Sequence, residues 1–290
     1  MLVGTDWLAE RLDDPNVVVV DLRWREDGSG RARYDEGHIP GARFVDWTTD
    51  IVDRSHRLAF MLAAPDEFAG TMESLGISDE SVIVAYADDR GSGPHRLWWA
   101  SRVYGHDNVR VLDGGLEQWV AEGKPVSTEA ATPSPGRWTA VVSEGLVATR
   151  DDVASAHSET NVVVLDSRPP DQFRGEKVWF ETGPIAADAD GIARTPRGEL
   201  RAGRVPWAVS VPAETLYRTD FTMKSGAELE ALLRPTRALD ASRVVTYCGV
   251  GISAAALLFA LTTVGVEDVS LYDASWDEWG RDPSLPVARG

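Results

Sequence analysis

The sequence predicts an α/β protein made of two similar halves, each built on a small parallel β-sheet flanked by helices. Two observations lead to this prediction. First, β-branched apolar runs alternate along the chain with stretches of helical periodicity, which is the pattern of βαβ crossovers in a parallel sheet. Second, the motifs of the first half return in the same order in the second half.

The clearest repeated motif is an apolar run that ends in Asp-x-Arg. It reads VVVVDLR at 17–23 and VVVLDSR at 162–168. Such a fully apolar run is typical of a strand that helices cover on both faces.

A helix is predicted before each of these strands. Thr5 or Asp6 starts the first of them. Thr149, followed three residues later by Asp152, resembles a capping box that starts the second.

The remaining strands also match in pairs. SVIVAYA (81–87) corresponds to RVVTYC (243–248), and VRVLDGGLEQW (109–119) corresponds to VSLYDASWDEW (269–279). The first pair leads into two predicted helices, HRLWWASRVYG (95–105) and SAAALLFALTTVG (253–265). GHIPGARFV (37–45) has a less exact partner in GRVPWAVSV (203–211). We therefore expect the same order of elements in both halves.

The boundary between the halves is marked by composition. EGKPVSTEAATPSPG (122–136) is rich in Pro, Ser, Thr and Gly and has no apolar periodicity, which indicates a linker. We place the first domain at 1–124, the linker at 125–142 and the second domain at 143–290.

Composition limits the kinds of partner. The formal net charge of −17 disfavours nucleic acid and anionic membranes. No apolar run is long enough to cross a bilayer, and the N-terminal sequence lacks the pattern of a signal peptide. One cysteine cannot form an intrachain disulfide, so we expect a reducing, cytoplasmic setting.

That single cysteine, Cys248, lies where a predicted strand turns into a helix, in VVTYCGVGISAAALLFAL. Backbone N–H groups at such a turn, together with the positive end of the helix dipole, would stabilise a thiolate and later an anionic persulfide. Cys248 is the predicted nucleophile, and the predicted active-site loop comprises Gly249, Val250, Gly251, Ile252, Ser253 and Ala254. The five histidines are scattered, and we expect neither metal nor cofactor.

The residues around Cys248 exclude two other kinds of cysteine-dependent activity. Thioredoxin-type exchange needs a second cysteine. A cysteine phosphatase needs an arginine six positions after the nucleophile, where this chain has Ala254. In the first half Ala87 and Asp88 follow Tyr86 where Cys248 follows Tyr247, so that half is predicted to be catalytically inert.

These motifs resemble those of the tandem-domain rhodanese-type sulfurtransferases. The resemblance rests on GHIPGA with DGGLEQW in the first half, on the Cys-Gly-x-Gly loop with YDASWDEW in the second, and spans nearly the whole chain. It implies two rhodanese domains and transfer of a sulfane sulfur from thiosulfate or 3-mercaptopyruvate, through a Cys248 persulfide, to a thiophilic acceptor. Cyanide, a small thiol or thioredoxin are the expected acceptors.

The resemblance also suggests where the donor binds. VDRSHRLAFML (52–62) is similar to a segment that reaches the active site in this family, which makes Asp53 and Arg54 candidates. Family members tend to carry a donor-binding arginine where this chain has Gln172, and Arg174 is the expected substitute. Arg204 replaces the histidine of the usual G-H-I-P-G-A motif and is a further candidate.

The residues after Cys248 bear on the choice of donor. Gly249 and Val250 stand where thiosulfate-specific members often carry basic residues, and mercaptopyruvate-type members usually have a serine at the position of Val250. One alternative function stays open, a non-catalytic rhodanese-fold module that binds a partner or senses persulfides. The intact cysteine loop argues against it, whereas GRVPWAV and Gln172 argue for it.

Overall fold

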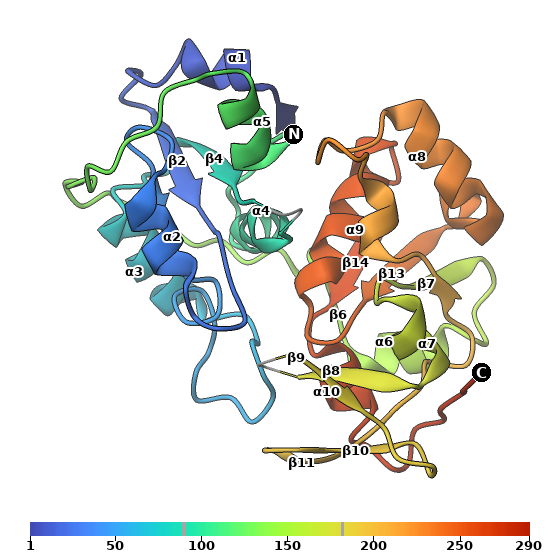
Figure 1. Ribbon diagram of the computed structural model, residues 1–290. Coiled ribbons are helices and arrows are strands. Elements are labelled where there is room, and N and C mark those ends of the chain that lie inside the picture. The colour runs from blue at the N-terminus through green and yellow to red at the C-terminus, as the bar shows by residue number, and fades with distance from the viewer. Residues whose placement is uncertain (89–90, 181–182) are drawn as a thin grey trace. The chain divides into compact units, whose positions relative to one another are not determined.

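The computed structural model describes residues 1–88, 91–180 and 183–290. The chain forms two compact units (Figure 1). Unit 1 comprises Met1–Arg54, Leu62–Glu144 and Tyr217–Met223, and unit 2 comprises Ser55–Met61, Gly145–Leu216 and Lys224–Gly290. Each half of the chain therefore contributes one short segment, 55–61 or 217–223, to the unit built mainly from the other half.

Within the described residues, unit 1 contains a five-stranded parallel sheet in the order β1-β5-β4-β2-β3. Its strands are β1 (Leu2–Val3), β2 (Val17–Asp21), β3 (Arg43–Phe44), β4 (Val82–Tyr86) and β5 (Val109–Leu112). The helices of unit 1 are α1 (Thr5–Ala9), α2 (Gly30–Glu36), α3 (Pro65–Ser74), α4 (Gly93–Val103) and α5 (Gly115–Ala121).

The main sheet of unit 2 has the same arrangement, in the order β12-β7-β13-β14-β6. Its strands are β6 (Val147–Ala148), β7 (Val162–Asp166), β12 (Val209–Ser210), β13 (Arg243–Tyr247) and β14 (Val269–Tyr272). The helices are α6 (Arg150–Ser155), α7 (Pro170–Arg174), α8 (Gly226–Leu233), α9 (Ile252–Thr263) and α10 (Ser275–Trp279). The repeat predicted from sequence is confirmed in the topology.

Unit 2 also has two antiparallel hairpins, β8 (Lys177–Phe180) with β9 (Gly183–Ala186) and β10 (Ile192–Thr195) with β11 (Gly198–Arg201). Short 3-10 helices are found at Glu144–Leu146, Ala213–Leu216, Arg234–Thr236 and Ala238–Asp240. None of the described helices has both the length and the apolar content that crossing a bilayer requires.

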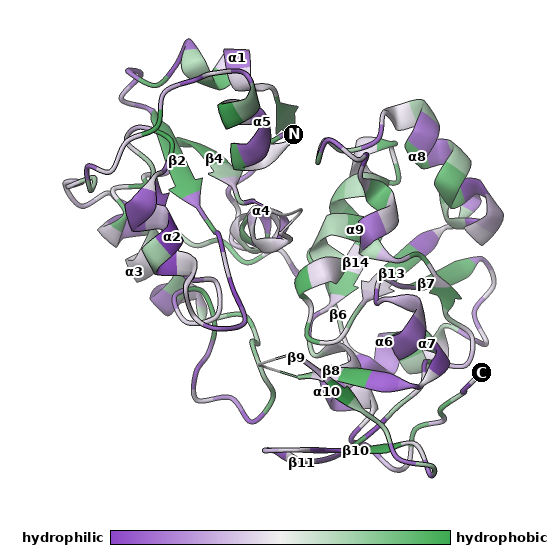
Figure 2. Ribbon diagram, in the orientation of Figure 1, coloured by the Kyte–Doolittle hydropathy of each residue, from purple (hydrophilic) through white to green (hydrophobic). Residues whose placement is uncertain are grey.

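The apolar runs form the strands because both faces of each sheet are covered. Figure 2 shows β2 and β7 largely in the hydrophobic colour. β2 and β4 pair residue by residue from Val17 opposite Val82 to Asp21 opposite Tyr86, and β7 and β13 pair in the same way. Helix α9 is buried nearly all round, as expected of a helix without a polar face.

The predicted helix starts are found at the expected places. Thr149 caps α6 through a capping box with Asp152, which confirms that prediction. α1 begins at Thr5, with Gly4 as its cap and no capping hydrogen bond from a side chain.

The segment predicted as a linker packs along unit 1. The Gly136 N–H donates to the Glu73 carbonyl at 2.8 Å, and the Val141 N–H donates to the Tyr104 carbonyl at 3.1 Å. The Trp138 side chain is buried against Phe68 and His106. The segment is therefore polar in composition and yet held against unit 1 by backbone hydrogen bonds and the buried Trp138 side chain.

A buried ion pair closes the carboxyl end of the second strand in both units. In unit 2, Arg168 Nη2 lies 2.6 Å from Asp166 Oδ2 and donates to the Gly203 carbonyl at 2.7 Å. In unit 1, Arg23 Nη2 lies 2.8 Å from Asp21 Oδ2 and donates to the Gly37 carbonyl. Burial opposes the charge on Arg168, but the nearby Asp166 outweighs it and raises the pKa of the guanidinium.

We predict that Arg168→Met destabilises the protein by about 3–5 kcal/mol, because it leaves the Asp166 carboxylate buried without its partner. Urea unfolding measures the change. Arg194→Met is the matched control, since Arg194 is 71% exposed in its ion pair with Asp188 and should change the unfolding free energy little. Equal effects of the two substitutions would contradict this account of the pair.

Candidate active site

Cys248 follows the central strand β13 and precedes helix α9, at the carboxyl edge of the unit 2 sheet. Its side chain is only 3% exposed. Gly251 caps α9 in the left-handed conformation, with φ of +79°. The strand-to-helix turn is thus confined to residues 248–251, and in open α/β sheets this edge is where ligands bind.

Two backbone donors in the turn are available to a ligand. Within the described part of the chain, the N–H groups of Gly249 and Val250 donate no hydrogen bond. These are the two amides that directly follow Cys248. Free amides at the start of a helix favour an anion.

The Cys248 backbone is held from one side by the start of α10. Its N–H donates to Ser275 Oγ at 3.0 Å, and its carbonyl accepts from the Trp276 N–H at 3.0 Å. The Gly249 carbonyl accepts from the Asp277 N–H at the same distance. Three consecutive residues of α10 therefore hold three consecutive peptide groups of the loop.

The loop is held from the other side by the end of β7. Ser167 N–H donates to the Tyr247 carbonyl at 3.0 Å, and Ser167 Oγ lies 3.0 Å from Ser253 Oγ. The Tyr247 hydroxyl accepts from the Val205 N–H at 3.2 Å. Burial and the neighbouring Asp166 raise the pKa of Tyr247, which keeps the hydroxyl protonated.

An aromatic side chain borders the loop. A Cβ built on Gly249 would lie 3.7 Å from the Cβ of Trp179, whose ring centroid is 6.1 Å from that of Phe60. Two other aromatics considered from the sequence have different surroundings. Trp207 packs edge-on against Trp279, and Phe173 lies under the Arg204 guanidinium.

The donor-binding candidates are not gathered at the loop. Arg174, 48% exposed, pairs with Glu176 at 2.6 Å, and Arg204 donates to the Gly290 carbonyl at 2.7 Å. Arg54 belongs to unit 1, is 69% exposed and donates to the Thr49 carbonyl. Asp53, next to it, is half-buried. Among described residues, the hydrogen bonds and ion pairs of these three arginines all go to segments other than 248–254.

Gln172, at the position where the family tends to have arginine, is buried on α7. Its Oε1 has no hydrogen-bond partner among the described residues. This position therefore offers a neutral amide and no charge.

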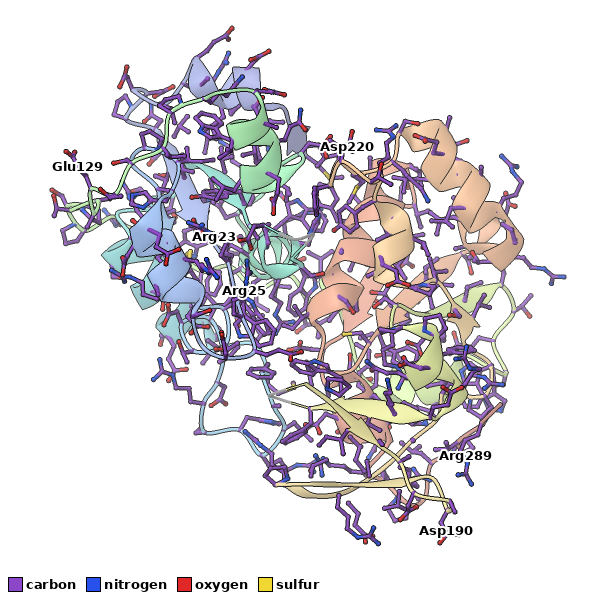
Figure 3. The ribbon with its side chains drawn as sticks, in the orientation of Figure 1. Arg23, Arg25, Glu129, Asp190, Asp220 and Arg289 are labelled. Atoms are coloured by element: carbon purple, nitrogen blue, oxygen red, sulfur yellow. The ribbon has the colours of Figure 1, made fainter. Side chains whose placement is uncertain are left out.

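The corresponding edge of unit 1 is blocked. Asp88 follows Ala87 and forms a two-pronged ion pair with Arg25, at 2.8 and 2.6 Å. Figure 3 labels Arg25 together with Arg23. The segment 217–223 places Tyr217, Phe221 and Met223 over this edge, leaving a cavity of only about 30 Å³. Asp89 and Arg90, from the same stretch of sequence, lie outside the described residues.

Unit 2 keeps more space at its own carboxyl edge. A cavity of about 410 Å³ lies where β6 and β14 end. Arg57, Arg150 and Glu278 line it, and so does Ala274, the residue before Ser275. The two units thus share a fold and differ in how open this edge is.

Residues 1–88, 91–180 and 183–290 contain no candidate metal-binding site. No group of three or more His, Cys, Asp or Glu side chains there is arranged to hold an ion. What the site offers is one thiol, two free amides and an adjacent indole.

Sequence reasoning did not find Ser167 or Ser275, which position the loop. Their contacts join residues 80 and 27 positions apart. One signal for Ser275 was available: the aligned motifs VLDGGLEQW and LYDASWDEW differ at this position, with Gly115 in the first half and Ser275 in the second.

Comparison with known proteins accounts for the repeat. The model of the rhodanese-like domain matches twice, at residues 4–122 and 149–282. The chain belongs to the rhodanese family. Its two rhodanese domains are arranged in tandem, as the sequence predicted.

Rhodanese relatives match the chain over nearly its whole length. The sulfur carrier protein TtuD of Thermus thermophilus is 35% identical over 100% of this chain and 97% of its own. The 3-mercaptopyruvate sulfurtransferase of Escherichia coli is 32% identical, with 98% and 96% covered. The thiosulfate sulfurtransferase of Rattus norvegicus is 33% identical, with 100% and 95% covered.

Solved structures agree with the rhodanese assignment. The crystal structure of SseA, a 3-mercaptopyruvate sulfotransferase from Escherichia coli, superposes with a TM-score of 0.80 at 32% identity, covering 95% of this chain and 98% of its own. The wild-type structure of EanB reaches a TM-score of 0.82 at 22% identity and shows similarity of fold alone.

We predict that the two loop glycines differ in their tolerance of a side chain. Gly251→Ala should cost about 1 kcal/mol of stability, because a residue with a Cβ is strained at φ of +79°. Gly249→Ala should be neutral, since its Cβ makes only ordinary contacts with Trp179. Urea unfolding of both variants tests this, and a larger loss for Gly249→Ala would contradict the loop geometry.

Proposed function

We propose that the protein is a rhodanese-type sulfurtransferase that carries a sulfane sulfur on Cys248 as a persulfide. The observation that carries this proposal is the position of the thiol beside two free amides, those of Gly249 and Val250, at the mouth of helix α9. The names of the full-length relatives, 3-mercaptopyruvate and thiosulfate sulfurtransferase, support the reaction class.

The first half-reaction loads the sulfur. The Cys248 thiolate attacks the outer sulfur of thiosulfate, the sulfur–sulfur bond of the donor breaks, and sulfite leaves with the bonding electron pair. With 3-mercaptopyruvate the carbon–sulfur bond breaks instead, and the hydrogen of the donor thiol ends on the methyl group of pyruvate. Either donor leaves Cys–S–S⁻ on the protein.

The second half-reaction unloads it. A thiophilic acceptor attacks the terminal sulfur, and the Cys248 thiolate leaves with the electrons of the broken sulfur–sulfur bond. Cyanide gives thiocyanate, and a small thiol or a thioredoxin gives its own persulfide. The sulfur carrier protein among the relatives makes a protein acceptor a further possibility for the same chemistry.

The backbone of the turn supplies the electrostatic part of the catalysis. Amide donors fixed before the reaction stabilise negative charge on sulfur without reorganising when that charge develops. We propose that the amides of the 249–254 loop serve both the thiolate and the persulfide. No metal or cofactor enters the scheme, and a lone thiol suits a reducing compartment such as the cytoplasm.

One arginine is proposed to hold the donor carboxylate in a bidentate grip. Arg174 and Arg54 are candidates, with Arg204 and Asp53 as further contacts. The ion pair of Arg174 with Glu176 is half-exposed, and surface pairs of this kind contribute little free energy, so it does not prevent a second partner.

We predict that Cys248→Ser abolishes sulfur transfer and leaves the fold intact, because one buried atom changes and serine is a poor sulfur nucleophile. Turnover of thiosulfate and 3-mercaptopyruvate with cyanide as acceptor measures the loss. Unfolding by urea, run in parallel, verifies the fold. Turnover near the wild-type value in a folded variant would overturn the assignment of the nucleophile.

We also predict that 3-mercaptopyruvate is used as well as thiosulfate or better, by kcat/KM. Thiosulfate carries two negative charges, and in the loop only amide dipoles face them, whereas one cation at 4 Å would add roughly 1–4 kcal/mol. Val250 is buried, so position 249 is the place to add that cation. Gly249→Arg should lower the KM for thiosulfate about tenfold.

Gly226→Arg, which adds the same charge at an exposed position of unit 2, should leave that KM unchanged. A wild-type kcat/KM clearly higher for thiosulfate would contradict the donor preference and leave the persulfide mechanism standing.

A further inference from the structure

Ser275 has a backbone conformation that residues with a side chain rarely adopt. It lies at the first position of α10 with φ of +51° and is fully buried. An L-residue in this region is strained and persists only when its surroundings hold it there. The strain falls at the residue that contacts the backbone of Cys248.

The Ser275 hydroxyl makes two hydrogen bonds. Its Oγ accepts from the Cys248 N–H at 3.0 Å and donates to the Tyr272 carbonyl at 2.8 Å. The hydroxyl thereby connects the end of β14 to the residue that follows β13. Both of its hydrogen bonds are buried, so neither competes with water.

The same position in unit 1 shows what the backbone alone requires. Gly115 has φ of +57°, and the next residue, Leu116, donates to the Ala87 carbonyl as Trp276 does to that of Cys248. A Cβ on Gly115 would lie 2.3 Å from that carbonyl oxygen. Glycine therefore adopts this backbone conformation in the unit without a thiol, and serine occupies the position only in the unit that has the thiol.

We propose that Ser275 is a positioning residue for the sulfur chemistry of Cys248, an inference that rests on the proposed function. By taking up the Cys248 N–H, its hydroxyl fixes the peptide that carries the nucleophile. The N–H groups of Gly249 and Val250 then stay free for the sulfur. Without the hydroxyl, the buried Cys248 N–H lacks an acceptor and the turn must shift to satisfy it.

Two substitutions separate the hydroxyl from the backbone conformation. Ser275→Gly removes both the hydroxyl and the strain, so relief of the strain should partly offset the loss of the two buried hydrogen bonds. Ser275→Ala removes the hydroxyl and keeps the strain. The matched control is Ser270→Ala on β14, which removes a buried hydroxyl that has no hydrogen-bond partner among the described residues.

The experiment measures the rate of Cys248 alkylation by iodoacetamide at pH 7, alongside kcat for sulfur transfer and urea unfolding. In the native wild type the thiol should react faster than in the urea-unfolded protein, because the amides of the turn favour the thiolate, which is the nucleophile. Both Ser275 variants should lower the alkylation rate and kcat about tenfold each. Ser270→Ala should change neither.

The outcomes distinguish the two proposals. A native wild-type alkylation rate no higher than that of the unfolded protein overturns the proposed activation of Cys248, and with it the role of Ser275. A high native rate that Ser275→Gly and Ser275→Ala both retain overturns the role of Ser275 alone. Recovery in Ser275→Gly but not in Ser275→Ala would show that only the backbone conformation matters, which also contradicts the inference.

Discussion

Each sheet ends in a buried Asp–Arg pair, and the loops around the candidate site depend on it. Asp166 holds Arg168, whose guanidinium reaches the Gly203 carbonyl and stacks 4.5 Å from the Trp276 ring centroid. The pair therefore fixes the loop before β12 and the start of α10 with one side chain. Because α10 in turn holds the peptides of Cys248 and Gly249, the position of the thiol depends on an ion pair in the core.

The two rhodanese domains share this framework and diverge beyond it. Tyr86 and Tyr247 end equivalent strands. The Tyr86 hydroxyl accepts from the Ile39 N–H in the segment before β3, and the Tyr247 hydroxyl accepts from the Val205 N–H in the segment before β12. After these tyrosines, unit 1 has an ion-paired aspartate, and unit 2 has a thiol followed by two free amides. The two copies thus share these structural hydrogen bonds, and only the second carries a cysteine.

Features that depend on short stretches of sequence could be predicted. The apolar strands, the capping box at Thr149 and the turn at Cys248 all follow from neighbouring residues. Contacts between distant segments could not, because no local pattern encodes them. The Met223 N–H donates to Asp113 across 110 positions, and the placement of 217–223 in unit 1 was not foreseen. The Ala59 N–H donates to Asp277 across 218 positions, and only the family resemblance indicated that the segment 52–62 reaches the active site. The partners of Arg174 and Arg204 likewise depend on where the C-terminal residues lie.

The central claim is that Cys248 carries the transferred sulfur. Intact-protein mass spectrometry tests it most directly, after incubation with a donor and again after cyanide is added. The account predicts a stoichiometric gain of about 32 Da, the mass of one sulfur atom, which maps to the Cys248 peptide and disappears with cyanide. A protein that turns over donor and acceptor without ever gaining this mass would contradict the account.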